Sequence, residues 1–346
     1  MISCVKLQIV CAVLLCGLSG GAESQAVVAG IGIDYMPSVQ RDQQDGSLVM
    51  VFERLDPGTF FGDLYATRSA DDGETWSNPQ LIIGSSANER HPSLVQMADG
   101  QWRLYYLQGS GSTTSYRIAQ ATSTDGSVFL QTGALDLGWA SGGEVNPHVV
   151  QQADRLTMVY QRLSGGIYLA QSTDSGISWD TQRRLISSDG LLPRVAYRTQ
   201  DSRLFVSYQT NPGSNQLRLH LKQSTDPGDW TSPAIMLASD GDNHDSLPWL
   251  TEEGGLVVFF SRARGSQYDL ASRFAPDGLN FESIRWQSQS ADSSDVQAHP
   301  VSVTGERDWV QLYWGVESPP GSLAFDVHRM TRTAISHAIF SNGAEQ

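Results

Sequence analysis

The octapeptide SADDGETW at residues 69–76 recurs as STDSGISW at residues 172–179, and both fit the pattern Ser-x-Asp-x-Gly-x-x-Trp. Shorter or eroded copies stand at residues 123–129 (STDGSVF), 224–230 (STDPGDW) and 274–281 (FAPDGLNF). The aspartate of each copy can accept backbone N–H bonds in a tight turn, the glycine can take a positive φ, and the closing aromatic ring can return to apolar packing. Each copy therefore predicts a β-hairpin turn whose aspartate is structural rather than catalytic or calcium-binding.

A second repeated element precedes these turns. It consists of a proline, alternating apolar residues, a turn with Asp or Gly, and a run of apolar and aromatic residues. Its prolines are Pro37, Pro92, Pro147, Pro193, Pro248 and Pro300, which stand 55, 55, 46, 55 and 52 residues apart. Proline at the first residue of a strand removes no ladder bond. The period is that of one propeller blade, so we expect an all-β fold: a six-bladed β-propeller with four-stranded antiparallel blades.

The sixth repeat has no hairpin phrase after it, which leaves its fourth strand open. Residues 333–340 can supply that strand, or residues 27–33 can supply it by pairing with the last blade. We expect closure by the N-terminal strand, because a sealed ring leaves no exposed sheet edge.

The first 26 residues have the pattern of a secretory signal peptide. An early lysine and an apolar run at residues 9–18 precede small residues that allow cleavage after Ala22 or Ala26. The apolar run is too short for a comfortable membrane span. We therefore expect residues 1–26 to be a signal, and residues 27–346 to form a single propeller domain that is secreted or periplasmic.

All three cysteines, Cys4, Cys11 and Cys16, fall inside this leader. The exported chain would then contain no disulfide and no reactive thiolate. Cys16 precedes a glycine, as a lipidated cysteine does, but Leu15 is a poor small-residue neighbour, so we expect no lipid anchor.

The overall charge restricts the partners. The chain carries 23 Lys and Arg against 37 Asp and Glu, a formal net charge of −14, and its isoelectric point is near 4.8. Proteins that bind nucleic acids concentrate basic residues, because the release of counterions drives that binding. The composition therefore argues against a nucleic-acid partner, and an anionic ligand would need a local basic pocket.

The six repeats, the hairpin phrase (the Asp box) and the proline-led strands together resemble the sialidase superfamily of six-bladed propellers over about residues 34–330. The resemblance implies an enzyme acting on carbohydrate, first of all a sialidase-like exo-glycosidase. Sialidases usually open the first inner strand with an aromatic-Arg-Ile-Pro phrase, whose arginine belongs to a triad that binds the sugar carboxylate. In this chain the phrase ends in Tyr35, Met36 and Pro37, and Met36 is taken to stand in place of that arginine.

The resemblance also implies that the inner strands begin at the active face and that the Asp boxes lie on the opposite face. Polar residues at the starts of the inner strands and at the ends of the second strands should then surround one cavity. The residues expected to bind substrate there are Arg54, Arg90, Arg162, Arg194, Arg262 and His299, with Arg264 beside them. Convergence of these arginines would favour an acidic oligo- or polysaccharide as the partner.

A glycosidase needs a carboxylic acid to protonate the leaving oxygen and a nucleophile or base opposite it. The carboxylates able to supply these groups are Glu89, Glu144, Asp245 and Glu53. Sialidases instead use a tyrosine nucleophile activated by a glutamate, and the possible tyrosines are Tyr35, Tyr160, Tyr208 and Tyr313. The candidates for catalysis are Glu144, Glu89, Asp245, Tyr35 and His91. We expect replacement of Glu144 by Gln to abolish turnover and preserve the fold.

Two other classes of function remain open. Four histidines, His91, His148, His244 and His299, stand near the inner-strand starts, and a polysaccharide lyase on a uronate-containing glycan would use His or Tyr as its base and acid. A non-catalytic propeller that binds glycan or protein would fit the missing arginine. The histidines lack the paired spacing of metal ligands, and we expect neither a metal nor another cofactor.

Overall fold

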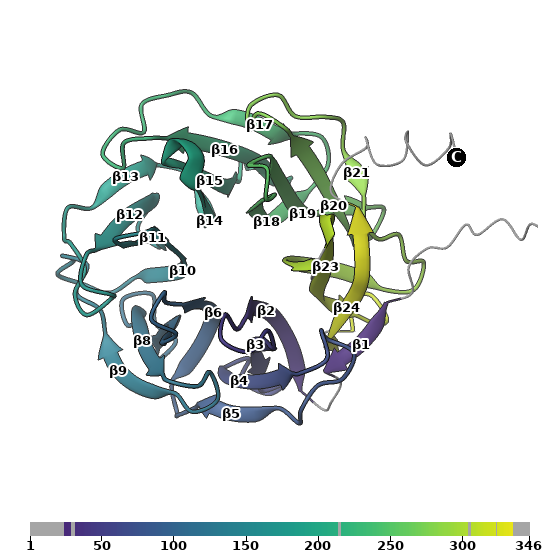
Figure 1. Ribbon diagram of the computed structural model, residues 1–346, viewed down its shortest axis with the longest axis horizontal. Helices are drawn as coiled ribbons and strands as arrows, with labels where there is room; N and C mark the ends of the chain where they lie inside the picture. Colours follow the sequence, from purple (N-terminus) through teal and green to yellow (C-terminus); the bar gives the residue numbers. More distant parts are fainter. Residues whose placement is uncertain (1–23, 29–31, 214–215, 304–305, 323, 335–346) are drawn as a thin grey trace, which may run out of the picture.

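The computed structural model describes all residues except 1–23, 29–31, 214–215, 304–305, 323 and 335–346. Six four-stranded antiparallel sheets are arranged around one central axis (Figure 1), which confirms the predicted six-bladed propeller. The one helical segment among the described residues is a 3₁₀ turn, Thr199–Asp201. No helix in this part of the chain is long and apolar enough to cross a membrane. The predicted cleavage site after Ala22 and the three cysteines lie outside the described residues.

Blades 1 to 3 follow one another along the first half of the chain. Blade 1 contains β2 (Ile33–Arg41), β3 (Leu48–Leu55), β4 (Gly62–Ser69) and β5 (Gln80–Ile83). Blade 2 contains β6 (Asn88–Gln96), β7 (Trp102–Gly109), β8 (Arg117–Ser123) and β9 (Leu130–Ala134). Blade 3 contains β10 (Glu144–Gln151), β11 (Leu156–Arg162), β12 (Ile167–Ser172) and β13 (Arg184–Ser187).

Blades 4 to 6 complete the ring. Blade 4 contains β14 (Leu191–Arg198), β15 (Arg203–Thr210), β16 (Arg218–Ser224) and β17 (Ile235–Ala238). Blade 5 contains β18 (Asn243–Leu250), β19 (Leu256–Arg264), β20 (Gln267–Ala275) and β21 (Arg285–Trp286). Blade 6 contains β22 (Ser294–Val303), β23 (Glu306–Glu317), β24 (Phe325–Ala334) and the N-terminal strand β1 (Gln25–Val28).

An N-terminal strand closes the ring, as predicted, but it comprises residues 25–28 rather than 27–33, and Ile33 begins β2 of blade 1. β1 lies antiparallel to β24, with Gln25 opposite Arg329, and the Arg329 guanidinium donates a hydrogen bond to the Gln25 side chain. Among the described residues, the fourth place in blade 6 is therefore filled by residues 25–28 rather than by residues beyond β24. Cleavage of a leader after Ala22 would leave this strand whole, whereas cleavage after Ala26 would divide it.

Apolar side chains of neighbouring blades pack against each other. One buried cluster joins Val49 and Val51 of blade 1 to Trp102 and Leu104 of blade 2, and each of the four is at most 1% exposed. Similar clusters lie between the other neighbours around the ring. Burial of this apolar surface holds the blades together.

The hairpin phrases form the predicted turns. Asp71 accepts hydrogen bonds from the Thr75 backbone N–H (2.8 Å) and from the Ser69 hydroxyl (2.8 Å), while Gly73 takes a φ of 87° that favours glycine. The Trp76 indole donates to the Gly73 carbonyl (3.0 Å). The next residue, Asp72, pairs with Arg41 at the end of β2. The turns therefore lie on the face where the inner strands end.

Each inner strand contains a β-bulge close to its start, where the register with the second strand shifts. One residue of each bulge has a positive φ: Met36, His91, Asn146, Leu192, Asp245 and Gln297. In blades 1 to 4 a proline follows this residue directly. In blades 5 and 6 the following residues are Ser246 and Ala298, and Pro248 and Pro300 come two residues later. The prediction that the six prolines occupy equivalent positions was therefore wrong for blades 5 and 6, where the proline lies two residues further along the strand.

A side chain from the preceding blade accepts the N–H of most of these bulge residues. The acceptors are Glu53 for His91 (2.7 Å), Gln161 for Leu192 (3.0 Å), Gln209 for Asp245 (3.1 Å) and Ser261 for Gln297 (3.1 Å). All four stand at the same place on the second strand of their blade, opposite the residue before the bulge. Three of these acceptors are neutral side chains. Glu53 is the one carboxylate among the four structurally equivalent acceptors.

Candidate functional site

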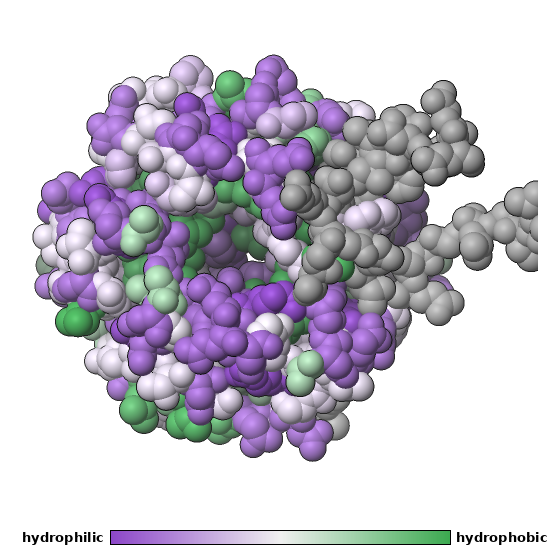
Figure 2. Space-filling model, in the orientation of Figure 1, coloured by the Kyte–Doolittle hydropathy of each residue, from purple (hydrophilic) through white to green (hydrophobic). Residues whose placement is uncertain are grey.

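The propeller encloses a central channel with a wide and a narrow part. Figure 2 shows the ring hollowed at its centre, with hydrophilic residues over most of the rim and apolar residues on the visible inner wall. The wide part, which we call the vestibule, has a volume of about 700 Å³ and is lined by the second halves of the inner strands. The narrow part, the throat, has a volume of about 40 Å³ and lies nearer the inner-strand starts. Its lining includes Met36, Pro92, His148, Arg194, Asp245, Gln297 and His299.

Opposite charges meet at the throat. Asp245 is paired with the imidazole of His244, its neighbour in the chain. Burial disfavours the ionised form of Asp245, but His244 and then Arg194 outweigh it and hold the pKa of Asp245 below its ordinary value. The pKa of His244 is raised, because Asp245 outweighs the effect of burial on the imidazole. These two residues therefore favour a carboxylate beside an imidazolium.

Arg194 has no carboxylate partner at ion-pair distance among the residues that the structure describes. Its one hydrogen bond goes to the carbonyl of Pro193 (3.0 Å). Burial lowers its pKa, and the charges of Asp245 and Glu53 act against that shift. Arg194 thus brings a positive charge to the throat. The carboxylates that act on this charge, Asp245 and Glu53, lie beyond ion-pair distance.

A second charged group lies at the inner-strand starts of blades 1 and 2. The Arg90 guanidinium donates to Glu53 from Nε (3.2 Å) and Nη2 (2.9 Å), and it also bonds the hydroxyl of Tyr35. The Tyr35 ring stacks on Phe325, with 5.4 Å between centroids. Burial first, and then the charge of Glu53, raises the pKa of Tyr35 above its ordinary value, with a smaller contribution from Asp245. Tyr35 therefore lies within the field of both carboxylates.

Three histidines at or next to the bulges of the inner strands have lowered pKa values, which favours their neutral form at pH 7. Burial lowers the pKa of His91 and of His299 to about 4, and it lowers the pKa of His148 well below its ordinary value. The Nδ1 atom of His148 accepts the Val195 N–H (3.2 Å), and the Nε2 atom of His299 donates to the Val39 carbonyl (2.9 Å). These bonds fix the tautomers: His148 carries its proton on Nε2, and so does His299.

We expect these histidines to make the fold sensitive to mild acid. The unfolded chain binds protons on His91 and His299 below pH 6.5, whereas the folded chain does so only near pH 4, so stability falls as the pH is lowered through that window. His244, whose pKa is raised, acts in the opposite direction. The His299→Gln variant can still donate to Val39 but cannot titrate. Its melting temperature should fall less than that of the wild type between pH 7 and pH 4.5, and an equal fall would contradict the argument.

The predicted arginines are not brought together around the throat. Arg194 alone among them lines it, and the others are held by carboxylates close to them. These pairs are Arg54 with Asp34 (2.6 Å), Arg90 with Glu53 (2.9 Å), Arg162 with Glu144 (2.9 Å), Arg262 with Asp240 (2.6 Å), and Arg264 with Asp269. The geometry therefore offers no cluster of free guanidinium groups for a sugar carboxylate, and the acidic glycan stays a prediction without that support.

Glu89 and Glu144 are buried two residues before the bulge of their blades, as is Asp34 in blade 1. Glu89 accepts bonds from Ser85 (2.6 Å) and Gln108 (3.0 Å). Glu144 accepts bonds from two arginines. Neither glutamate lines the throat, and the same is true of Tyr35 and Glu53. The catalytic role of Glu89 and Glu144 stays a prediction.

Of the four tyrosines considered in the sequence, Tyr35 directly precedes Met36, which lines the throat. Tyr160, Tyr208 and Tyr313 are buried in the cores between blades, at 3% exposure or less. The count along the first strand also needs correction. In an Arg-Ile-Pro phrase the arginine stands two residues before the proline, and that position is Tyr35 rather than Met36.

Glu53 is the residue whose importance the sequence did not reveal. It was one of four carboxylates considered as catalytic groups, and no feature of the sequence favoured it over the other three. The signal that could have found it is register: Glu53 stands opposite Tyr35 on the neighbouring strand. In the described part of the chain, no group of three or more His, Cys, Asp or Glu residues is placed to hold a metal ion.

Several solved structures share this fold. A protein of unknown function from Dyadobacter fermentans superposes with a TM-score of 0.73 at 14% identity, covering 91% of this chain and 98% of that one. The α-L-arabinofuranosidase of Fusarium graminearum, solved with an iminosugar inhibitor, gives 0.70 at 13% identity, with 91% and 98% covered. The NanB sialidase of Streptococcus pneumoniae gives 0.69 at 11% identity, with 90% and 70% covered. At these identities the likeness shows the fold alone.

The sequence itself gives a match to a family. A comparison with curated proteins found no significant match. The model of the BNR repeat-like domain matches residues 34–259, which is more than half of the chain. This match agrees with the repeats on which the resemblance to sialidase-like propellers was based, and the sialidases among the structural neighbours share the fold. The chain belongs to the family of BNR repeat-like domains.

Proposed function

We propose that the protein is a glycoside hydrolase whose reacting groups are Tyr35, Glu53 and the His244–Asp245 pair. The observation that carries the proposal is the contact of Tyr35, Arg90 and Glu53 at the inner-strand starts of blades 1 and 2. A tyrosine beside a buried glutamate is the arrangement that a tyrosine nucleophile requires, because the glutamate can take its proton. The enzymes among the structural neighbours, an arabinofuranosidase and sialidases, support action on a glycan.

The proposed reaction has two steps. In the first, the Tyr35 oxygen forms a bond to the anomeric carbon and its proton passes to Glu53. The bond to the leaving oxygen breaks, and that oxygen takes a proton from the His244 imidazolium. In the second, a water molecule attacks the anomeric carbon and gives a proton to the neutral His244, while the departing Tyr35 oxygen regains its proton from Glu53. Arg90 holds the Tyr35 oxygen, and Asp245 favours the imidazolium form of His244.

We propose a neutral terminal sugar as the substrate. The arginines around the channel start are neutralised by their own carboxylates, Arg194 excepted, so a sugar carboxylate would gain little from them. One relative in the same fold, the Fusarium graminearum enzyme, was solved with the neutral disaccharide arabinobiose. An acidic sugar is the alternative, and it would depend on Arg194.

Non-catalytic glycan binding is the second candidate function. The throat, at about 40 Å³, is narrower than small-molecule sites usually are, so a sugar ring would stand at its mouth rather than inside it. A protein that only binds there would hold glycan without releasing any product.

The test is an assay of purified protein with arabinobiose, 3′-sialyllactose and polygalacturonate. New reducing ends from arabinobiose are expected, and the Tyr35→Phe variant should lose at least about a hundredfold in turnover because it lacks the nucleophile. Tyr168→Phe, a change on the outer strand β12, is the matched control and should keep full activity. Release of sialic acid would favour the acidic substrate, and an unsaturated product from polygalacturonate would indicate a lyase. No product from any of the three would overturn the proposal and leave the binding function.

A further inference from the structure

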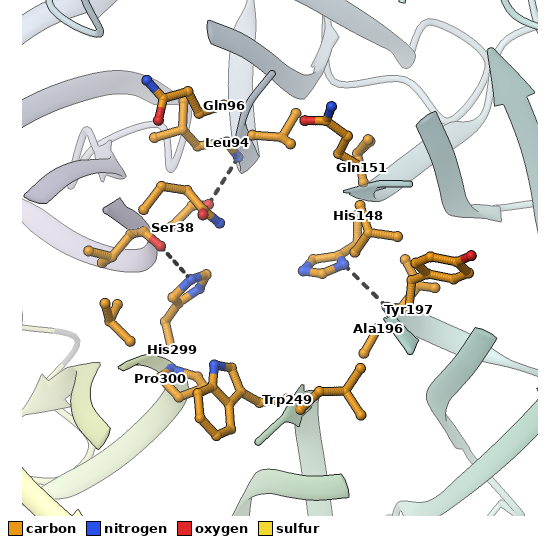
Figure 3. Close-up of a pocket in the computed structure, with 18 of the residues that line it drawn as sticks. Ser38, Leu94, Gln96, His148, Gln151, Ala196, Tyr197, Trp249, His299 and Pro300 are labelled. Atoms are coloured by element: carbon orange, nitrogen blue, oxygen red, sulfur yellow. Dashed lines mark hydrogen bonds between the residues drawn. The ribbon is translucent and has the colours of Figure 1, made fainter. Parts of the chain in front are cut away.

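The vestibule plays no part in the proposed hydrolysis. The vestibule opens toward the face where the inner strands end, whereas Tyr35 and Glu53 stand at their starts. In Figure 3 the rings of His148 and His299 extend toward the axis from opposite walls, and Gln151, Tyr197 and Trp249 lie around the same cavity. A volume of about 700 Å³ falls within the range of roughly 300–1,000 Å³ that is usual for small-molecule sites.

The vestibule offers hydrogen-bonding groups that the protein itself does not use. The side chains of Gln40, Gln151, Tyr197 and Trp249 make no hydrogen bond with any described residue, although all four line the cavity and are partly exposed. They come from four different blades, so they surround the cavity rather than form one cluster. Polar groups gathered in a cavity are favourable when a bound molecule or water satisfies them.

The deep end of the vestibule adds one donor and one acceptor. The His148 Nδ1 atom accepts the Val195 N–H, so its Nε2–H is free to donate. The His299 Nε2–H donates to the Val39 carbonyl, so its Nδ1 lone pair is free to accept. A ligand that reaches this end can thus be both acceptor and donor, as a hydroxyl group can.

The vestibule has no free charge among its described lining residues. Its lining includes Arg41, whose guanidinium pairs with Asp72 (2.5 Å) and also donates to two backbone carbonyls. The two histidines are neutral at pH 7. An anion would find no unpaired cation here, and a cation would find no carboxylate in the lining. A purely apolar ligand would leave the amides of Gln40 and Gln151 without partners.

From this lining we infer that the vestibule is a second ligand site, which binds a neutral oligosaccharide. Amide side chains from two walls can bond sugar hydroxyls, and the faces of Trp249 and Tyr197 can pack against the C–H surface of a sugar ring. The site does not depend on the proposed hydrolysis, because none of its residues belongs to that group. It would hold a second part of a glycan, on the face away from the reacting residues.

The inference can be tested by calorimetric titration of the full chain with arabinobiose and with cellobiose as neutral probes. A Glu53→Gln background prevents hydrolysis during the titration. We expect Gln40→Ala and Gln151→Ala each to weaken binding by about three- to tenfold, the loss of one or two hydrogen bonds. Trp249→Ala should weaken it further, while Trp249→Phe, which keeps an aromatic face, should weaken it less. Gln131→Ala, on the exposed strand β9, should bind as the parent does.

Three results would overturn the inference. The first is that neither neutral probe binds. The second is that both glutamine variants bind as tightly as the parent, which remains decisive even if Trp249→Ala fails to fold. The third is that Tyr35→Phe loses binding while the vestibule variants keep it, which places the ligand at the proposed hydrolytic site. That third result would leave the proposed function standing, and failure of hydrolysis alone would leave the vestibule site untouched.

Discussion

The Glu53→Gln variant is expected to fold as the wild type does and to lose turnover by about 10²- to 10⁴-fold, the usual contribution of a general base. In the proposed mechanism Glu53 takes the proton of Tyr35, and an amide cannot. The variant also removes the charge that holds Arg90 beside the Tyr35 hydroxyl. The loss should appear in kcat, because the proton transfer takes place after the sugar is bound.

The fold should survive this change because the protein already uses glutamine at the equivalent position. Gln161 and Gln209 accept the bulge N–H of the next blade as Glu53 does, at 3.0 and 3.1 Å against 2.7 Å. Arg90 loses its carboxylate in this variant but is partly exposed, so thermal melting should show a loss of stability smaller than the about 3–5 kcal/mol expected when a fully buried pair is broken. The measurement is kcat and KM on whichever substrate is hydrolysed, with Glu253→Gln, an exposed glutamate, as the control. Full turnover in the Glu53 variant would show that another group serves as the base.

The architecture could be predicted from the sequence because its signals are local. The hydrogen bonds of the turn around Asp71 join residues at most four apart, so the phrase at residues 69–76 is sufficient to form it. Its five copies mark five of the blades, and the proline-led element, which occurs six times, gives the sixth. The prolines were a weaker guide, since a proline is tolerated at more than one place near a strand start. Pro248 and Pro300 therefore stand two residues further from the bulge than the prolines of blades 1 to 4 do.

The site could be predicted only in part, because its contacts link distant residues. Arg90 was predicted to lie near the cavity, but its partner Glu53 could not be predicted, because it is 37 residues away on another blade. Arg54 and Arg162 were expected to contact substrate, yet each is engaged by a carboxylate of its own blade. The residues expected near the cavity can be named from the sequence, but the ion pairs among them cannot. Strand register and side-chain direction determine which arginine meets which carboxylate.

Glu144 shows how such pairing changes the expected effect of a substitution. It is 2% exposed and accepts hydrogen bonds from both Arg117 (2.8 Å) and Arg162 (2.9 Å). The Arg162 guanidinium also lies over the ring of Trp139, at 4.2 Å from its centroid. Glu144→Ala would leave Arg162 buried without its carboxylate. Removal of one partner from a buried pair costs about 3–5 kcal/mol, so we expect a loss of that size in the free energy of unfolding.

Urea unfolding of the Glu144→Ala protein measures this loss, and Asp154→Ala provides the matched control. Asp154 forms an exposed pair with Arg155 (2.7 Å), whose loss should cost at most about 1 kcal/mol. Glu144→Gln separates the structural role from the catalytic one that the sequence predicted. If the pairing with the two arginines is the function of Glu144, the Gln variant will be less stable, but its folded fraction will turn over substrate at the wild-type rate. A stable Gln variant without turnover would instead make Glu144 a catalytic residue, and the proton transfers assigned to Glu53 would have to be reassigned.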